Sequence, residues 1–82
     1  MRYTVKTKLD AEKVYQQAEA FFGPEGNGME ISEGTPGCCA HFQTNLGYVH
    51  MDIREEEKKT AVDLETREYD IQVRTFMNQL PK

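Results

Sequence analysis

The amino-acid sequence predicts an α+β fold, in which a single five-stranded antiparallel sheet carries two helices on one face. Between Gly37 and Thr66, three stretches in succession alternate apolar and polar side chains with a period of two. This period is typical of strands with one buried and one exposed face. Stretches with a helical period lie near both ends of the chain. The predicted order of elements is therefore β-α-β-β-β-β-α.

The first strand and the first helix are predicted from the opening residues. Residues 2–9 alternate apolar and basic or hydroxyl side chains, which indicates a half-buried strand. An apolar stripe at helical spacing then predicts a helix over residues 11–22. Asp10 has the side chain of an N-cap residue, and Gly23 followed by Pro24 is a helix stop.

The four later strands are expected to form a meander. A short strand with Met29 and Ile31 facing inward precedes the three strands already described. The inward positions of those three strands are Cys38, Ala40 and Phe42, then Val49, Met51 and Ile53, then Val62 and Leu64.

The parity of the apolar residues limits the pairing between residues 38–43 and residues 48–53, because a shift by one residue would expose the apolar set. Two registers remain open. In one, His41 lies opposite His50 and Cys39 lies opposite Asp52. In the other, His41 lies opposite Asp52 and Gln43 lies opposite His50.

The C-terminal helix is predicted from residue 68 onward. Its apolar positions are Tyr69, Val73, Phe76, Met77 and Leu80, which follow a helical period. Either Thr66 or Asp70 has the chemistry of its N-cap, and the sequence leaves both open. Pro81 stops the helix.

Two stretches of the chain resemble a group of small bacterial proteins that have no assigned function. They are residues 21–30 (FFGPEGNGME) and residues 65–70 (ETREYD). The order of elements is also similar to the TATA-box-binding-protein-like topology, of which helix-grip ligand-binding proteins are an elaborated version. The resemblance implies a fold and the possibility of an apolar ligand, and it implies no activity.

Composition restricts the classes of partner. The chain has 82 residues, enough for one domain over residues 1–82, and a formal net charge of −4. A nucleic-acid-binding surface or a surface for anionic membranes requires clustered basic residues, so neither partner is expected. No apolar run is long enough for a membrane span. Two adjacent cysteines are no disulfide framework, which favours a reduced cytoplasmic protein.

The outward side chains of the central hairpin form a candidate metal site. Cys39, His41, His50 and Asp52 share one face in both registers, with directly opposed Cβ atoms about 5 Å apart. Thiolate, imidazole and carboxylate groups at this spacing could bind Zn²⁺. The alternative is an ordinary solvated sheet face, which we favour because no close ligand pair such as C-x-x-C supports the metal site. No cofactor is expected.

Cys38 and Cys39 also raise the question of a redox switch. Successive strand residues point to opposite faces, and adjacent Cα atoms are closer than in usual disulfides. We therefore expect Cys38 to be a small core residue and Cys39 to carry an outward thiol.

The strongest functional hypothesis is a small non-enzymatic interaction or self-assembly module, either a homodimer or a binder of another protein. The alternative is a binder of small apolar ligands, with a pocket between the C-terminal helix and the sheet. Arg67, Tyr69 and Phe76 are the candidate ligand-binding residues for such a pocket. No catalytic triad or buried carboxylate pair can be assembled, so an enzyme is not expected.

Overall fold

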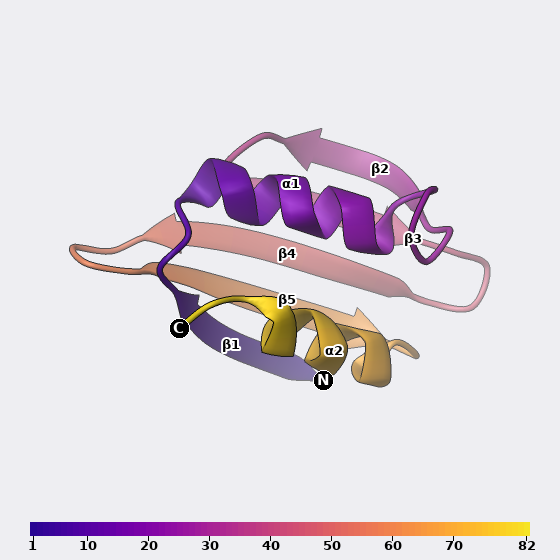
Figure 1. Cartoon of the computed structure of the whole chain (residues 1–82). Coiled ribbons are helices and arrows are strands. Elements are labelled where there is room, and N and C mark those ends of the chain that lie inside the picture. The colour runs from indigo at the N-terminus through magenta and orange to yellow at the C-terminus, as the bar shows by residue number, and fades with distance from the viewer.

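The computed structural model describes residues 1–82 and contains five strands and two helices in the predicted order (Figure 1). The elements are β1 (Arg2–Thr7), α1 (Ala11–Phe22), β2 (Glu30–Thr35), β3 (Cys39–Gln43), β4 (Tyr48–Glu55), β5 (Thr60–Arg67) and α2 (Asp70–Gln79). The predicted fold class is confirmed. Neither helix is long and apolar enough to span a membrane.

All strands belong to one antiparallel sheet in the order β1-β5-β4-β3-β2. The meander of β2 to β5 is as predicted. The first strand joins it through β5, with Tyr3 opposite Leu64 and Val5 opposite Val62. Since α1 carries the chain across the sheet between β1 and β2, these two strands form the opposite edges (Figure 1).

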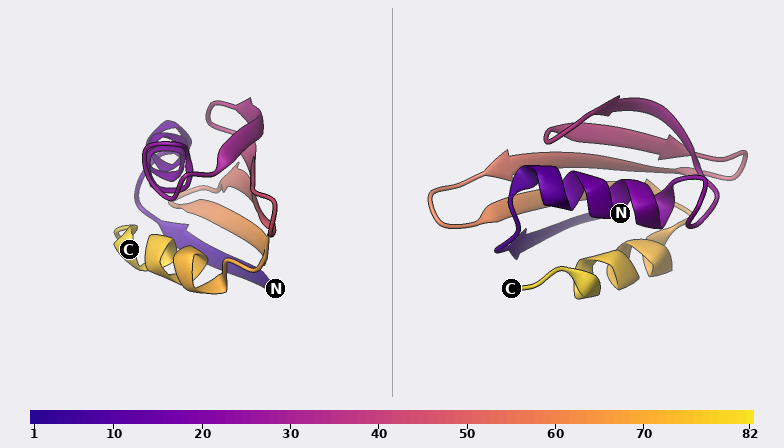
Figure 2. Two further views of the ribbon diagram at one scale, coloured as in Figure 1. Left: turned by 90° about the vertical axis from the view of Figure 1, so that its right-hand side faces the viewer. Right: turned by 45° about the horizontal axis from the view of Figure 1, so that its top comes forward.

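Both helices cover the same face of the sheet (Figure 2). Their apolar side chains meet those of the strands in one continuous core, which leaves the other face of the sheet without cover. The largest fully buried side chains are Phe22, Phe42, Phe76, Met29, Met51, Leu64, Val14, Val49, Val62 and Val73. The Phe22 ring lies close to two other buried rings, with its centroid 5.3 Å from that of Phe42 and 5.1 Å from that of Phe76.

The predicted ends of α1 are confirmed. The Asp10 carboxylate accepts a hydrogen bond from the Lys13 N–H at 2.9 Å, so one of the free amides of the first turn is satisfied. At the other end, the Gly23 N–H donates to the Glu19 carbonyl at 3.0 Å. The helix ends at Phe22, directly before this glycine.

Both N-cap predictions for α2 are wrong. The N-cap position is Tyr69, which makes no capping hydrogen bond with its side chain. Thr66 remains within β5, where its hydroxyl donates to a backbone carbonyl of β4 at 2.7 Å. Asp70 is the first residue of the helix and accepts a hydrogen bond from the Tyr3 hydroxyl at 2.6 Å. The side chains of Thr66 and Asp70 therefore form long-range hydrogen bonds instead of capping the helix.

We expect Phe76→Ala to lower the free energy of unfolding by about 3–5 kcal/mol, because it removes a fully buried ring from the junction of both helices with the sheet. Urea titration measures this loss. Gln79→Ala, on the exposed side of the same helix, is the matched control and should change stability by no more than about 0.5 kcal/mol. A Phe76→Ala variant as stable as the control would contradict the assignment of Phe76 to the core.

Candidate functional site

The candidate site is the sheet face opposite the helices, here called the open face. Alternation along each strand places polar side chains on it wherever the neighbouring residues enter the core. Its central residues are Thr4 of β1, Cys39 and His41 of β3, Tyr48, His50, Asp52 and Arg54 of β4, and Asp63 and Glu65 of β5.

The pairing of β3 with β4 selects the first of the two predicted registers. His41 lies opposite His50, and Cys39 lies opposite Asp52. The Ile53 N–H donates a backbone hydrogen bond to the Cys38 carbonyl, so Cys38 and Ile53 form a hydrogen-bonded pair. Bonded and non-bonded pairs alternate along the ladder, so Cys39 with Asp52, and His41 with His50, are pairs without such bonds. Side chains approach most closely at pairs of this type, with Cα atoms about 4.5 Å apart. The two histidines occupy one of these close pairs.

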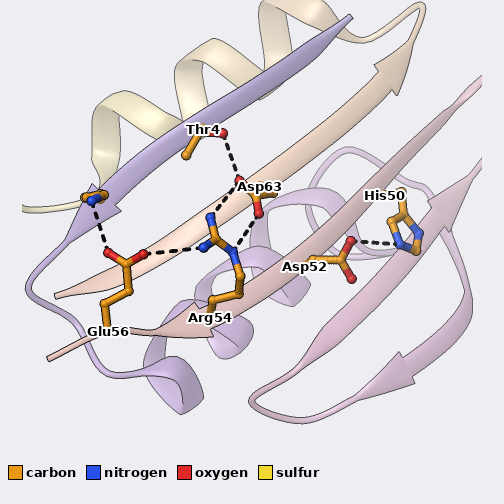
Figure 3. Close-up of polar contacts among 7 residues, drawn as sticks. Thr4, His50, Asp52, Arg54, Glu56 and Asp63 are labelled. Carbon is orange, nitrogen blue, oxygen red and sulfur yellow. Dashed lines mark hydrogen bonds and ion pairs between the residues drawn. The ribbon is translucent and has the colours of Figure 1, made fainter.

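The imidazoles face each other through their Nδ1 atoms, which are 3.1 Å apart. The remaining ring nitrogen of His50, Nε2, lies 3.4 Å from a carboxylate oxygen of Asp52 (Figure 3). The rings of Tyr48 and His41 stack with centroids 5.4 Å apart. Each imidazole ring therefore contacts a neighbouring side chain as well as the other imidazole, and both histidines are half-buried.

The cysteines differ from the prediction. Cys38 and Cys39 form a disulfide, so neither carries a free thiol. Cys38 lies in the exposed turn before β3, where its N–H donates to the Thr35 carbonyl at 2.9 Å, and it is not a core residue. The prediction of a core Cys38 and a free thiol on Cys39 is therefore wrong. The physical reason is that strand parity does not extend into the turn, and β3 begins only at Cys39.

The candidate metal ligands line one small hollow of about 100 Å³. Cys39, His41, His50 and Asp52 all contribute to its wall, which β2 completes with Glu33, Gly34 and Thr35. No group of three or more His, Cys, Asp or Glu side chains is arranged to hold a metal ion in this structure. The structure thus brings the four predicted residues together, and metal binding stays a prediction.

A second polar cluster, which was not predicted from the sequence, lies on the same face. The Arg54 guanidinium contacts Asp63 through Nε at 2.9 Å, and Thr4 donates a hydrogen bond to the same carboxylate at 2.8 Å (Figure 3). Hydrogen bonds from Arg54 and then from Thr4 hold the pKa of the Asp63 carboxyl below its usual value. Opposite charges at diagonal positions of β4 and β5 are the signal that could have identified this pair.

Tyr48 links the histidines to a third cluster. Its hydroxyl donates to Glu65 at 2.9 Å, and Glu65 also faces Arg2 at 3.4 Å. The hydrogen bond to Glu65, together with partial burial, raises the pKa of the Tyr48 hydroxyl. The polar groups of the open face therefore satisfy one another across four strands.

The candidate ligand-binding residues do not surround a cavity. Phe76 is fully buried against Phe21 and Phe22, and so fills the space between α2 and the sheet. Tyr69 hydrogen-bonds with the hydroxyl of Thr44, and Arg67 is exposed at the end of β5. None of the five hollows found on the structure is lined by any of these three residues. Ligand binding by Arg67, Tyr69 and Phe76 stays a prediction.

Comparisons with known proteins establish similarity at the level of the fold. No protein-family model matches the chain, and no curated protein matches it. Among solved structures, the chain is similar to the solution structure of the Aha1 dimer from Colwellia psychrerythraea, with a TM-score of 0.62 and 14% sequence identity. The similarity covers 95% of this chain and 85% of the other. It supports a small α+β fold.

The Asp63 cluster leads to a pH-dependent prediction. Because its folded-state pKa is depressed, Asp63 stabilises the fold above its unfolded pKa, and this contribution is lost as the pH falls through the folded value. We expect Asp63→Asn to lower the melting temperature by a few degrees at most at neutral pH, since the pair is partly exposed. The difference from the unchanged protein should shrink between about pH 5 and pH 2.

Thermal unfolding monitored by circular dichroism measures this difference at each pH. The control repeats the same substitution in an Arg54→Gln background, where the chief cause of the low pKa is absent. There the effect of Asp63→Asn should depend much less on pH. An equal pH dependence in both backgrounds would show that Arg54 does not stabilise the ionised carboxylate.

Proposed function

We propose that this chain is a non-enzymatic self-assembly module, which forms a homodimer by antiparallel pairing of β1 with β1 of a second copy. The observation that carries the proposal is the free outer edge of β1. An unpaired edge strand presents a row of backbone N–H and C=O groups that another strand can bind. Pairing at this edge would extend the five-stranded sheet into a continuous ten-stranded one.

The hydrogen-bond pattern identifies the free backbone groups. The backbone amines and carbonyls of Met1 and Thr66 form two bonds of 2.9 Å, which makes this a hydrogen-bonded pair of the β1–β5 ladder. Bonded and non-bonded residues alternate along an antiparallel strand. The backbone groups that point away from β5 are therefore those of Arg2, Thr4 and Lys6.

A two-fold axis through Thr4 gives the simplest pairing. Thr4 would then lie opposite its own copy, and Arg2 would lie opposite Lys6 of the second copy. The like charges of this pair are offset within each copy, because Arg2 lies 3.4 Å from Glu65 and Lys6 lies 3.0 Å from Glu56. Beyond Lys6 the edge is closed, since the Lys8 N–H donates to the Pro81 carbonyl.

The other edge and the open face are less suited to assembly. The β2 edge contains a register shift between Ile31 and Glu33 and ends at the turn that contains Pro36. Bulges and prolines of this kind protect edge strands from pairing. The open face would have to bury charged side chains that already contact one another, such as Arg54 and Asp63, and desolvation of such pairs is costly.

Two further observations support a dimer. A chain of this size buries only about 60–65% of its unfolded surface, so an intersubunit contact would add burial that the small core lacks. The solved structure to which the fold is similar is described as a dimer. We further propose that the chain is a bacterial, cytoplasmic protein and that its fold is related to that of the helix-grip proteins.

We expect multi-angle light scattering at high micromolar concentration to give about twice the chain mass of 9.5 kDa. Thr4→Pro removes the outward N–H at the proposed two-fold axis, once in each copy. Two lost hydrogen bonds, each contributing about 0.5–1.5 kcal/mol, should weaken the dimer about tenfold. Dilution series followed by light scattering measure the dissociation constant.

Thr4→Ala is the matched control, because it removes the side chain and its bond to Asp63 but keeps the backbone N–H. It should dimerise like the unchanged protein. Amide hydrogen exchange of the unchanged protein gives a test free of substitutions, since the amides of Thr4 and Lys6 should be protected in the dimer and exposed on dilution. A monomer at high micromolar concentration would refute the proposal.

A further inference from the structure

The hollow beside the disulfide has the chemistry of a metal site that lacks one ligand. Two histidines, one cysteine and two acidic residues, Glu33 and Asp52, line it, and these residue types supply the ligands that bind Zn²⁺ and related ions. The β3–β4 register fixes the places of all of these except Glu33, because His41 and His50 form one close pair and Cys39 and Asp52 form the next.

The two histidines already have the spacing of a chelating pair. Nitrogen ligands at about 2.0–2.1 Å from a tetrahedral ion lie about 3.3 Å from each other. The Nδ1 atoms of His41 and His50 are 3.1 Å apart. A small rotation of each ring would direct both nitrogens toward an ion in the hollow without movement of the strands.

Asp52 selects the nitrogen of His50 that is available. Its carboxylate faces Nε2 at 3.4 Å, so the ring proton belongs on Nε2 and the lone pair on Nδ1. A histidine held by a carboxylate on one nitrogen and free to ligate through the other is a common arrangement in metal sites. With this tautomer, the Nδ1 of His50 accepts a hydrogen bond from the Nδ1–H of His41. A bound ion would require that proton to move to Nε2 of His41.

The missing ligand is the sulfur of Cys39. It lines the same hollow, but it is bonded to Cys38 and has no thiolate charge to offer a metal ion. The structure contains no group of three or more His, Cys, Asp or Glu side chains arranged to hold a metal ion. Reduction would release the Cys39 side chain, which could then turn toward the two imidazoles.

We propose that Cys38 and Cys39 gate a metal site, which forms when their disulfide is reduced and binds Zn²⁺ or a similar ion through Cys39, His41 and His50. Asp52 is a positioning residue that orients His50. The three protein ligands leave a fourth position for water or another small ligand. This site does not depend on the proposed dimer.

The redox step is a thiol–disulfide exchange with a dithiol reductant. A thiolate of the reductant attacks the sulfur of Cys38, which is an exposed residue, and Cys39 leaves as a thiolate. The second thiol of the reductant then attacks the mixed disulfide and releases Cys38. The reductant gives up two electrons and becomes a disulfide, while its two protons pass to the released thiolates. Metal binding returns the Cys39 proton to solvent.

Cobalt titration of the full chain tests the gate, because Co²⁺ bound to a thiolate gives a charge-transfer absorption that imidazole or carboxylate alone does not. We expect the protein reduced with a phosphine to bind one Co²⁺ per chain with this absorption, and Zn²⁺ to displace it. The oxidised protein should bind at least about tenfold more weakly and show no charge-transfer band. Equal binding by both forms, or no band in the reduced form, would overturn the proposal.

Substitutions at Cys39 and Cys38 distinguish the proposed metal ligand from its disulfide partner. Cys39→Ser removes the ligand and should abolish the charge-transfer band under all conditions. Cys38→Ser is the matched control, since it removes only the partner of the disulfide and should bind Co²⁺ with or without the reductant. A Cys38→Ser variant that fails to bind, or a Cys39→Ser variant that keeps the band, would refute the assignment. Circular dichroism of both variants verifies that the fold is retained.

Discussion

The arrangement of this molecule depends on the burial of only one face of its sheet. Side chains on a strand alternate between faces, so each apolar residue that enters the core directs its neighbours outward. On the central hairpin, Phe42 and Val49 face each other in the core beneath both helices. The pair one place along, His41 and His50, must then face each other on the open side. The core thereby fixes the position of the chemically active groups without contacting them.

Much of this arrangement could be predicted from alternation alone, including the fold class and the shared face of the four candidate ligands. The choice between two registers could not, because registers that differ by two residues bury the same side chains. The turn between β3 and β4 determines the register. Thr44 N–H donates to the Gly47 carbonyl at 2.9 Å, and the Thr44 hydroxyl accepts bonds from the Leu46 and Gly47 amides at 3.1 and 3.3 Å. A threonine at the start of a turn was a usable signal.

The predictions at the start of β3 and at the start of α2 failed for a different reason. Cys38 lies one residue before β3, in a turn where Gly37 has a φ of +78°, so the alternation that places Ala40 in the core does not apply to it. Thr66 and Asp70 have the side chains of helix caps, yet both bond to distant strands. Local rules held inside the elements, where neighbours share one environment. They also held at both ends of α1, and they failed at the turn before β3 and at the start of α2.

The arrangement of the open face depends on the register of the central hairpin, because the pairing of His41 with His50 and of Cys39 with Asp52 follows from it. Nuclear Overhauser contacts between α-protons test it directly, since these protons are closest at antiparallel pairs without backbone hydrogen bonds. We predict strong contacts between the α-protons of His41 and His50 and between those of Cys39 and Asp52. The result that would contradict this register is a different set of contacts, from His41 to Asp52 and from Gln43 to His50, which would establish the other register.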